Sequence, residues 1–189
     1  MKSWVRDIVV ILVVALVAYG AIHLTIQNSR VDGTSMEPNL MNGEYLIVSK
    51  VSYLLSQPKR GDIIVFPSPY PGENNEFIKR VIGLPGETVS IVDGTVYING
   101  VALSEPYVVN HDQSNMAPVT VPDGEYFVLG DNRPVSLDSR YGWFVSRGEI
   151  VGKAWLCYWP LRDFRLAPNY KFPAALAFAF PILSLLPMR

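Results

Sequence analysis

The sequence from Val89 to Leu103 reads VSIVDGTVYINGVAL and contains three short apolar runs separated by Asp-Gly and Asn-Gly. These dipeptides are typical of tight hairpin turns, because their residues tolerate the positive φ angles that type I′ turns require. The chain also contains fifteen prolines and fourteen glycines, and no helical periodicity follows its N-terminal apolar run. The sequence therefore predicts a mainly β domain.

Further runs bounded by turn residues favour the same fold class. Together with the hairpin segment, the predicted strands are Tyr45 to Val48, Ile63 to Phe66, Phe77 to Ile82, Val89 to Val92, Thr95 to Ile98, Val101 to Leu103, Tyr126 to Leu129 and Ile150 to Trp159. The polar stretch from Glu105 to Asp123 is interpreted as a surface loop.

An uncharged apolar run from Ile8 to Ile26 precedes the β-rich part of the chain. Its 19 residues would form a helix about 28 Å long, close to the hydrocarbon thickness of a bilayer. Lys2 and Arg6 precede the run, so the positive-inside tendency predicts a cytoplasmic N-terminus and a larger domain on the opposite side. A cleaved secretory signal ending near Ala18-Tyr19-Gly20 is the alternative. A retained anchor is favoured, because the apolar run continues beyond that point.

These features predict three parts of the chain. Residues 1–28 form the N-terminal tip and transmembrane anchor, and residues 29–170 form the β-rich domain, with a small β insertion around 90–123. Residues 171–189 form an apolar tail. The tail is too short and too rich in proline to predict a second span, which leaves insertion into the membrane interface and packing on the β domain both open.

The composition excludes several classes of function. The formal net charge is −1 and the chain has no basic stripe, which argues against a nucleic-acid partner. The single cysteine, Cys157, and two distant histidines, His23 and His111, lack the clustered spacing of a zinc site, so we predict no metal and no cofactor. The scarcity of histidine also disfavours a Ser-His-Asp triad. A Ser-Lys dyad becomes the leading hypothesis for catalysis.

Ser35 is the candidate nucleophile, because Gly33 before it permits a sharp backbone turn and Pro38 follows it. Lys79 is the candidate base. In a strand from Glu76 to Ile82, Lys79 and Arg80 point to opposite faces among apolar neighbours. Burial lowers the pKa of a lysine toward the range of a general base, whereas arginine does not deprotonate usefully. The alternatives are an ordinary loop at Ser35 and an edge strand whose cations reach into water.

A third polar cluster, from Gly130 to Arg140, follows the predicted strand that ends at Leu129. If its last five residues are extended, Ser136, Asp138 and Arg140 point the same way. Asp138 and Arg140 are then able to pair, and Ser136 is able to orient an amine. A structural role is favoured over a chemical one for the pair.

Four blocks of the sequence resemble, in the same order, those of bacterial type I signal peptidase. Three of them contain the candidate residues described above, and the fourth runs from Arg60 to Phe66. The four blocks are Ser35 to Leu40, Arg60 to Phe66, Lys79 to Glu87 and Gly130 to Arg140. The resemblance implies the coiled antiparallel β-sheets of that family. It also implies a Ser35 nucleophile, a Lys79 base, a hydrogen bond from Ser136 to the lysine, and support of the site by Asp138 and Arg140.

The resemblance further implies how substrate is held and where the protein acts. The backbone N–H groups of Ser35 and Gly33 would hold the oxyanion, but some family members carry serine in place of Gly33, so the second donor stays open. Shallow pockets would accept small residues before the cut. Their candidate residues, for which core packing is the alternative, are Val31, Met36, Leu40, Phe77 and Ile78. The implied partners are preprotein signal peptides and the lipid bilayer, and the implied location is the plasma (inner) membrane, with the thylakoid as the alternative.

Two other classes of function remain as alternatives. A self-cleaving regulator would use the same dyad on its own chain, and a membrane-anchored peptide-binding module would not need Ser35 or Lys79. Cleavage of a second molecule distinguishes the proposed peptidase from both.

Overall fold

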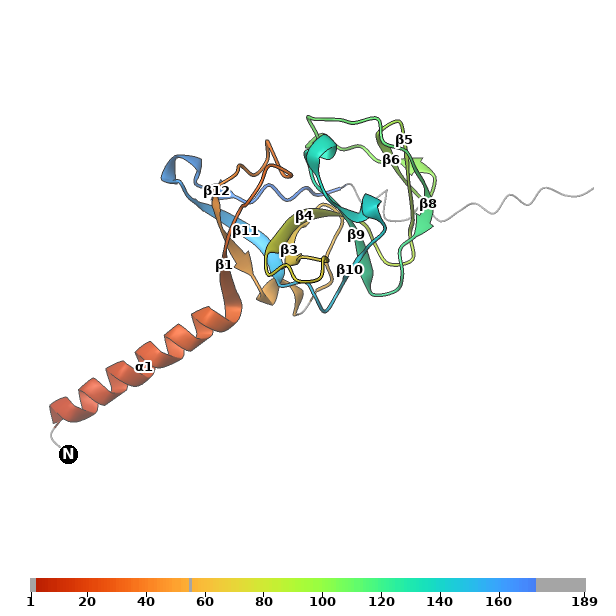
Figure 1. Ribbon diagram of the computed structural model, residues 1–189. Helices are drawn as coiled ribbons and strands as arrows, with labels where there is room; N and C mark the ends of the chain where they lie inside the picture. Colours follow the sequence, from red (N-terminus) through yellow and green to blue (C-terminus); the bar gives the residue numbers. More distant parts are fainter. Residues whose placement is uncertain (1–2, 55, 173–189) are drawn as a thin grey trace, which may run out of the picture.

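The computed structural model describes residues 3–54 and 56–172 of the chain. Helix α1 (Ser3–Thr25) extends away from the β-rich part, and strand β1 (Ile26–Arg30) begins directly after it (Figure 1). Among the described residues, α1 is the one helix long and apolar enough to cross a membrane. Its segment Trp4–Thr25 has a mean hydropathy of 2.5 and is not buried against the rest of the protein.

Eight strands form the larger sheet, in which every neighbouring pair is antiparallel. Their order is β1-β2-β11-β3-β4-β9-β10, with β12 paired to β11. The strands after β1 are β2 (Tyr45–Ser49), β3 (Ile63–Pro67), β4 (Glu76–Gly83), β9 (Glu125–Leu129), β10 (Val145–Ser146), β11 (Gly152–Trp159) and β12 (Arg165–Leu166). In the described part of the chain, four short 3-10 helices lie in the loops: η1 (Val51–Tyr53), η2 (Arg133–Val135), η3 (Ser139–Tyr141) and η4 (Leu161–Asp163). The prediction of a mainly β, antiparallel fold is confirmed.

A smaller sheet contains four strands in the order β7-β6-β5-β8. These are β5 (Thr88–Val92), β6 (Thr95–Ile98), β7 (Val101–Ala102) and β8 (Met116–Thr120). Asp93 and Asn99 have φ angles of 47° and 52°, as the predicted Asp-Gly and Asn-Gly turns require. The interpretation of residues 105–123 as a surface loop throughout was wrong, because β8 lies within it. This edge strand contains Pro118 and has no buried residue, so its sequence carries little strand signal.

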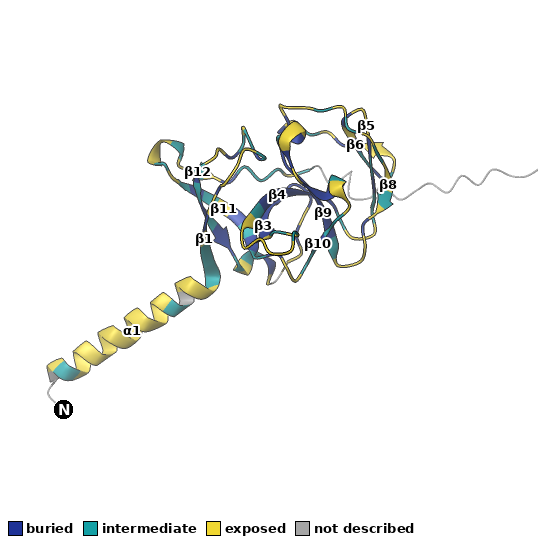
Figure 2. Cartoon of the chain, in the orientation of Figure 1, coloured by how far each residue is buried: buried dark blue, intermediate teal, exposed yellow. Residues whose placement is uncertain are grey.

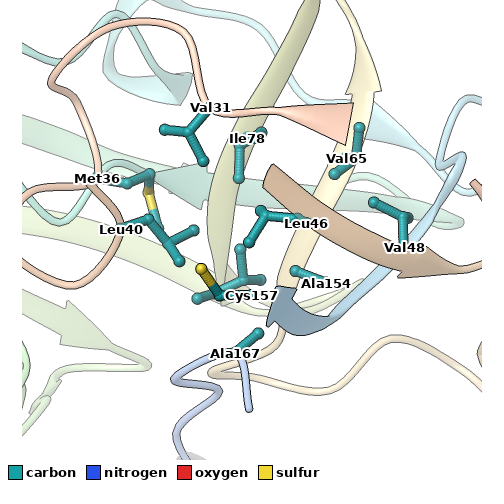
Figure 3. Packing of buried hydrophobic residues seen from close by; sticks show 11 residues of the cluster. Val31, Met36, Leu40, Leu46, Val48, Val65, Ile78, Ala154, Cys157 and Ala167 are labelled. Carbon is teal, nitrogen blue, oxygen red and sulfur yellow. The ribbon is translucent and has the colours of Figure 1, made fainter. Parts of the chain in front are cut away.

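The core of the larger sheet reaches into the loop that follows β1 (Figure 3). Met36 and Leu40 from that loop pack with Leu46 of β2, Ile78 of β4 and Cys157 of β11. Figure 2 shows the contrast between the buried central strands and the exposed surface of α1. The loop is therefore held by hydrophobic burial at two of its own residues.

A second cluster of buried residues joins the two sheets. Ile82 and Phe127 from the larger sheet pack with Val89 and Ile91 of the smaller one. Phe172, the last described residue, packs against this cluster as a partly buried side chain. The rest of the predicted apolar tail, residues 173–189, lies outside the described residues.

Candidate active site

Ser35 lies in the turn between β1 and β2. Gly33 has a φ angle of +94°, which a side chain would disfavour, so the chain reverses sharply just before the serine. Met36, next to it, is buried with 1% of its surface exposed, and the Leu40 N–H donates to the Met36 carbonyl at 2.9 Å. Ser35 is partly exposed, on a turn that the buried side chain of Met36 fixes to the core.

Lys79 lies in the middle of β4, between strands β3 and β9, with 4% of its surface exposed. Its Nζ donates to Ser35 Oγ at 2.6 Å. No carboxylate of the described residues forms a salt bridge with it. Burial lowers the pKa of Lys79 to about 8; Asp138 and Asp131 oppose this shift, and Arg140 adds to it. The structure thus brings together the predicted nucleophile and a lysine able to lose its proton near neutral pH.

Arg80 is fully buried and points to the other side of β4. Its Nε and Nη2 donate to the two carboxylate oxygens of Asp131 at 2.8 and 2.6 Å, and its Nη1 donates to the carbonyls of Gly61 and Pro168. The Tyr107 ring lies 4.1 Å from the guanidinium carbon. The alternative of an edge strand with cations in water was wrong. Arg80 is part of the scaffold, and its partner Asp131 received no role from the sequence.

The sequence is consistent with an extended segment from Ser136 to Arg140, but in the structure its last two residues belong to a 3-10 helix. Asp138 caps the 3-10 helix η3, which contains Arg140, and its Oδ1 accepts a hydrogen bond from the Arg140 backbone N–H. The predicted pair nevertheless forms. Arg140 Nε and Nη2 donate to Asp138 Oδ1 and Oδ2 at 2.8 and 2.9 Å. An extended segment would bring Asp138 and Arg140 to the same side. In the structure they meet because Asp138 caps the single turn of 3-10 helix that contains Arg140.

The structure does not contain the implied hydrogen bond between Ser136 and Lys79. Ser136 Oγ is buried and has no hydrogen-bond partner among the residues that the structure describes. It lies against Gly130, where an added Cβ would be 2.2 Å from Ser136 Oγ and 2.5 Å from the Ser35 carbonyl oxygen. Only glycine allows this approach, and the position of Gly130 directly after a buried strand was the sequence signal for it.

Two hydrogen bonds from Asn132 join the loop after β9 to the turn that contains the serine. The Asn132 backbone N–H donates to the Ser35 carbonyl at 3.0 Å, and its Nδ2 donates to the Thr34 carbonyl at 3.0 Å. Sequence reasoning did not assign this role. These bonds set the position of Ser35 relative to the loop that contains Asp138.

A cleft of about 320 Å³ opens beside the serine and lysine. Four of the five predicted pocket residues line it, namely Val31, Met36, Phe77 and Ile78. Leu40 does not line it. With no exposed surface, Leu40 belongs to the core cluster, which was the alternative for all five residues. Val135 and Leu137, which were not predicted, line the cleft and are half-exposed.

The two predicted oxyanion donors differ in the structure. The Gly33 N–H donates to the side-chain oxygen of Asn42 at 3.1 Å, so this group is already engaged. The Ser35 N–H makes no hydrogen bond to any of the described residues. In this structure, therefore, the Gly33 N–H is engaged by the carboxamide of Asn42, and the Ser35 N–H is the donor left without a partner among the described residues.

Comparison with known proteins places this chain in a family. The family described as "Signal peptidase, peptidase S26" matches residues 1–159. The chain belongs to the signal peptidase family. The resemblance seen in the four sequence blocks is confirmed, and with it the prediction that the chain is a hydrolase of the serine endopeptidase class.

Individual relatives carry the same name. A "Signal peptidase I" of Bacillus licheniformis is 36% identical over 174 residues, which cover 86% of this chain and 91% of the relative. A "Probable signal peptidase I-2" of Synechocystis sp. is 44% identical over 135 residues, covering 69% of this chain and 62% of the relative. A solved signal peptidase I from Enterococcus faecalis V583 is 45% identical and covers 52% of this chain and 97% of that chain, with a TM-score of 0.46.

Proposed function

We propose that this signal peptidase family member cuts signal peptides from preproteins with a Ser35-Lys79 dyad. The observation that carries the proposal is the 2.6 Å contact between Lys79 Nζ and Ser35 Oγ inside an apolar setting. A general base must lie within hydrogen-bond reach of the proton it removes and must be deprotonated at working pH. The lowered pKa of Lys79, about 8, fulfils the second condition for a useful fraction of molecules near neutral pH.

The reaction follows from this geometry in two stages. Neutral Lys79 takes the hydroxyl proton while Ser35 Oγ attacks the carbonyl carbon of the scissile bond. The resulting ammonium then gives its proton to the leaving amine, and the C–N bond breaks to give an acyl-enzyme. Water, activated by the same lysine, hydrolyses this ester and restores the serine.

The Ser35 N–H is the proposed donor to the oxyanion, because it has no partner among the described residues, whereas the Gly33 N–H is bound to Asn42. Loss of a single oxyanion donor costs about 3 kcal/mol in a serine protease. A second donor must come from a group that moves on substrate binding; the Thr34 side chain, exposed beside the cleft, is the proposed candidate.

Substrate is proposed to lie extended in the cleft, with small residues at the first and third positions before the cut. Val31, Met36, Phe77 and Ile78 narrow the cleft there, while backbone pairing supplies affinity that does not depend on side chains. Helix α1 is proposed to anchor the enzyme in the plasma membrane as a single span. By the positive-inside tendency, the N-terminal Lys2 and Arg6 support a proposed orientation with that end in the cytoplasm and the cleft on the export side.

The test uses the full chain, purified in detergent, and a preprotein with a small-x-small cleavage site. Wild type is compared with Ser35→Ala and Lys79→Ala. Lys153→Ala is the matched control, because Lys153 also lies in the larger sheet but pairs with Asp62. Cleavage at the expected site by wild type and by the control, and by neither dyad variant, is the expected result.

Other outcomes select other functions. Equal cleavage by Lys79→Ala and wild type would exclude Lys79 as the base. Cleavage of the chain itself, without cleavage of added preprotein, would favour a self-cleaving regulator. Preprotein binding that survives both dyad substitutions, with no cleavage by any form, would favour a peptide-binding module.

A further inference from the structure

The connection between β7 and β8 lies against the loop that follows β9, residues 130–140, which we name the catalytic loop, and pairs with it at several points. We name residues 104–115 the strap. Glu105 of the strap forms a two-point ion pair with Arg133, at 3.1 and 2.7 Å. The Asn110 carbonyl accepts a hydrogen bond from the Arg133 N–H, and the Tyr107 ring stacks on Arg80. The smaller sheet thereby contacts the loop that follows β9.

Asp112 of the strap binds Arg140, one member of the Asp138–Arg140 pair. Arg140 Nη1 donates to Asp112 Oδ2, while Nε and Nη2 of the same guanidinium bind Asp138. Nη2 also donates to the carbonyls of Arg133 and Ser136, at 2.7 and 3.3 Å. Arg140 is therefore held between two carboxylates, one on the catalytic loop and one on the strap.

Asp112 is itself held in place. Its Oδ1 accepts hydrogen bonds from the Ser114 N–H and Oγ at 3.3 and 2.9 Å. The Ser114 carbonyl in turn accepts from the N–H of Gly94, in the β5–β6 turn, at 2.9 Å. An added Cβ at Gly94 would lie 2.0 Å from the Asp112 carbonyl oxygen, so the turn and the strap are in close contact. The carboxylate is presented to Arg140 by the smaller sheet.

Arg140 also connects this contact to the dyad. The Asp138 carboxylate that it binds accepts a hydrogen bond from the Gly130 N–H at 3.1 Å, and Gly130 lies against Ser136 and the Ser35 carbonyl. A displacement of Arg140 would therefore reach the backbone beneath the nucleophile through Asp138 and Gly130. Asp112 does not line the cleft, so it does not contact substrate there.

We infer that Asp112 is a positioning residue for the dyad: by holding Arg140, it keeps Asp138 and the loop from Gly130 to Ser136 in place beside Ser35 and Lys79. This inference rests on the proposed dyad. Through the ion pair between Asp112 and Arg140, the smaller sheet would help to position the catalytic groups.

The arrangement predicts an electrostatic signature as well as a geometric one. The groups that act on Lys79 are Asp138 and Asp131, which raise its pKa, and Arg140, which adds to the lowering caused by burial. Removing the negative charge of Asp112 leaves Arg140 less neutralised. The charged form of Lys79 then becomes less favourable, and activity should persist to lower pH.

The experiment measures kcat and KM against pH for a soluble signal-peptide substrate, with the full chain in detergent. For Asp112→Asn we expect kcat to fall about tenfold through misplacement of the dyad, with little change in KM. We also expect the acid limb of the profile to move down by about half a pH unit. Asp112→Glu keeps the charge and should restore the position of the acid limb.

Glu105→Gln is the matched control, because it neutralises the other acidic residue of the strap that pairs with an arginine. Its partner Arg133 is not among the charges that act on Lys79, so the acid limb should stay where it is in wild type. His111, exposed next to Asp112, is unchanged in every variant. Ser114→Ala, which loosens Asp112 without changing charge, should lower kcat and leave the limb unmoved.

Several results would overturn the inference. One is an Asp112→Asn enzyme with the wild-type kcat and acid limb, and another is an equal shift of the limb in Glu105→Gln. If Asp112→Asn does not fold, an unchanged kcat in Ser114→Ala has the same force. Failure of the proposed function is separate, because it would appear as cleavage by Ser35→Ala or Lys79→Ala.

Discussion

The two faces of strand β4 bury one cation each, and they treat it in opposite ways. The planar guanidinium of Arg80 donates hydrogen bonds to both carboxylate oxygens of Asp131 and to two backbone carbonyls. The positive charge of Arg80 is therefore paired with the negative charge of Asp131. Lys79, one residue earlier, has the Ser35 hydroxyl as its hydrogen-bond partner and no salt bridge among the described residues. Breaking a buried ion pair such as that of Arg80 with Asp131 is strongly destabilising, whereas burial of the unpaired Lys79 lowers its pKa, so that it loses its proton more easily.

Exchanging the two cations tests the different roles of Lys79 and Arg80 directly. Lys79→Arg keeps a positive charge but introduces a group that does not deprotonate in proteins. We expect the rate of preprotein cleavage to fall at least ~1,000-fold at every pH, because the general base is lost. Single-turnover cleavage with excess enzyme measures this. Activity that returns at high pH would contradict the role of Lys79 as base.

The reciprocal exchange, Arg80→Lys, should affect the fold more than the chemistry. Lysine cannot bind both oxygens of Asp131 and both carbonyls, so buried acceptors lose partners. We expect a loss of about 2–3 kcal/mol in the free energy of unfolding, measured with urea. Arg162→Lys, at a side chain that is 84% exposed, should change it by less than ~0.5 kcal/mol. Equal effects of the two substitutions would refute the scaffold role.

The pH dependence of cleavage sharpens the same comparison. Because Lys79 acts in its neutral form and its pKa is about 8, activity should rise as pH increases and level off above this value. At pH 6 only about 1% of the lysine is neutral, so kcat/KM should be roughly 100-fold below the plateau. A profile that is flat between pH 6 and 9 would show that another group limits the reaction.

The shifted pKa of Lys79 also makes stability depend on pH. Because burial lowers the pKa of Lys79 from 10.5 to about 8, the unfolded chain binds more protons between these values. The free energy of unfolding of wild type should therefore rise with pH across that window, relative to Lys79→Met, by up to about 3 kcal/mol. Well below pH 8, where Lys79 is protonated in both states, the difference between the two proteins should be constant. Urea unfolding of both proteins at pH 7, 8, 9 and 10 tests this, and parallel curves would contradict the pKa.

Local chemistry explains which predictions from the sequence succeeded. The hairpins at Asp93 and Asn99 formed as expected, because positive φ is a property of the residues in the turn. The burial of Lys79 was visible in the apolar residues around it. The strand Met116–Thr120 was missed, because an exposed edge strand has no buried face to give it a pattern.

At the site, Leu40 and Gly33 differ from what the sequence indicated, because other groups of the folded chain contact them. Leu40 and Met36 lie in the same connection between β1 and β2. Leu40 packs wholly in the core, whereas Met36 packs in the core and also lines the cleft. The Gly33 N–H was available in principle, but Asn42, nine residues later, binds it. Spacing in the sequence does not show which of several acceptors a donor will reach.

Features that depend on neighbouring residues could be predicted from the sequence: an apolar helix, short strands with Gly-containing turns, and a serine and a lysine suited to the proposed chemistry. Tertiary structure decided which atoms meet. The contact between Ser35 and Lys79, the approach of Gly130 to Ser136, and the ion pair between Asp112 and Arg140 each join residues from different elements. Such contacts depend on the packing of the whole chain, because burial and charge pairing are settled only when distant segments compete for the same space.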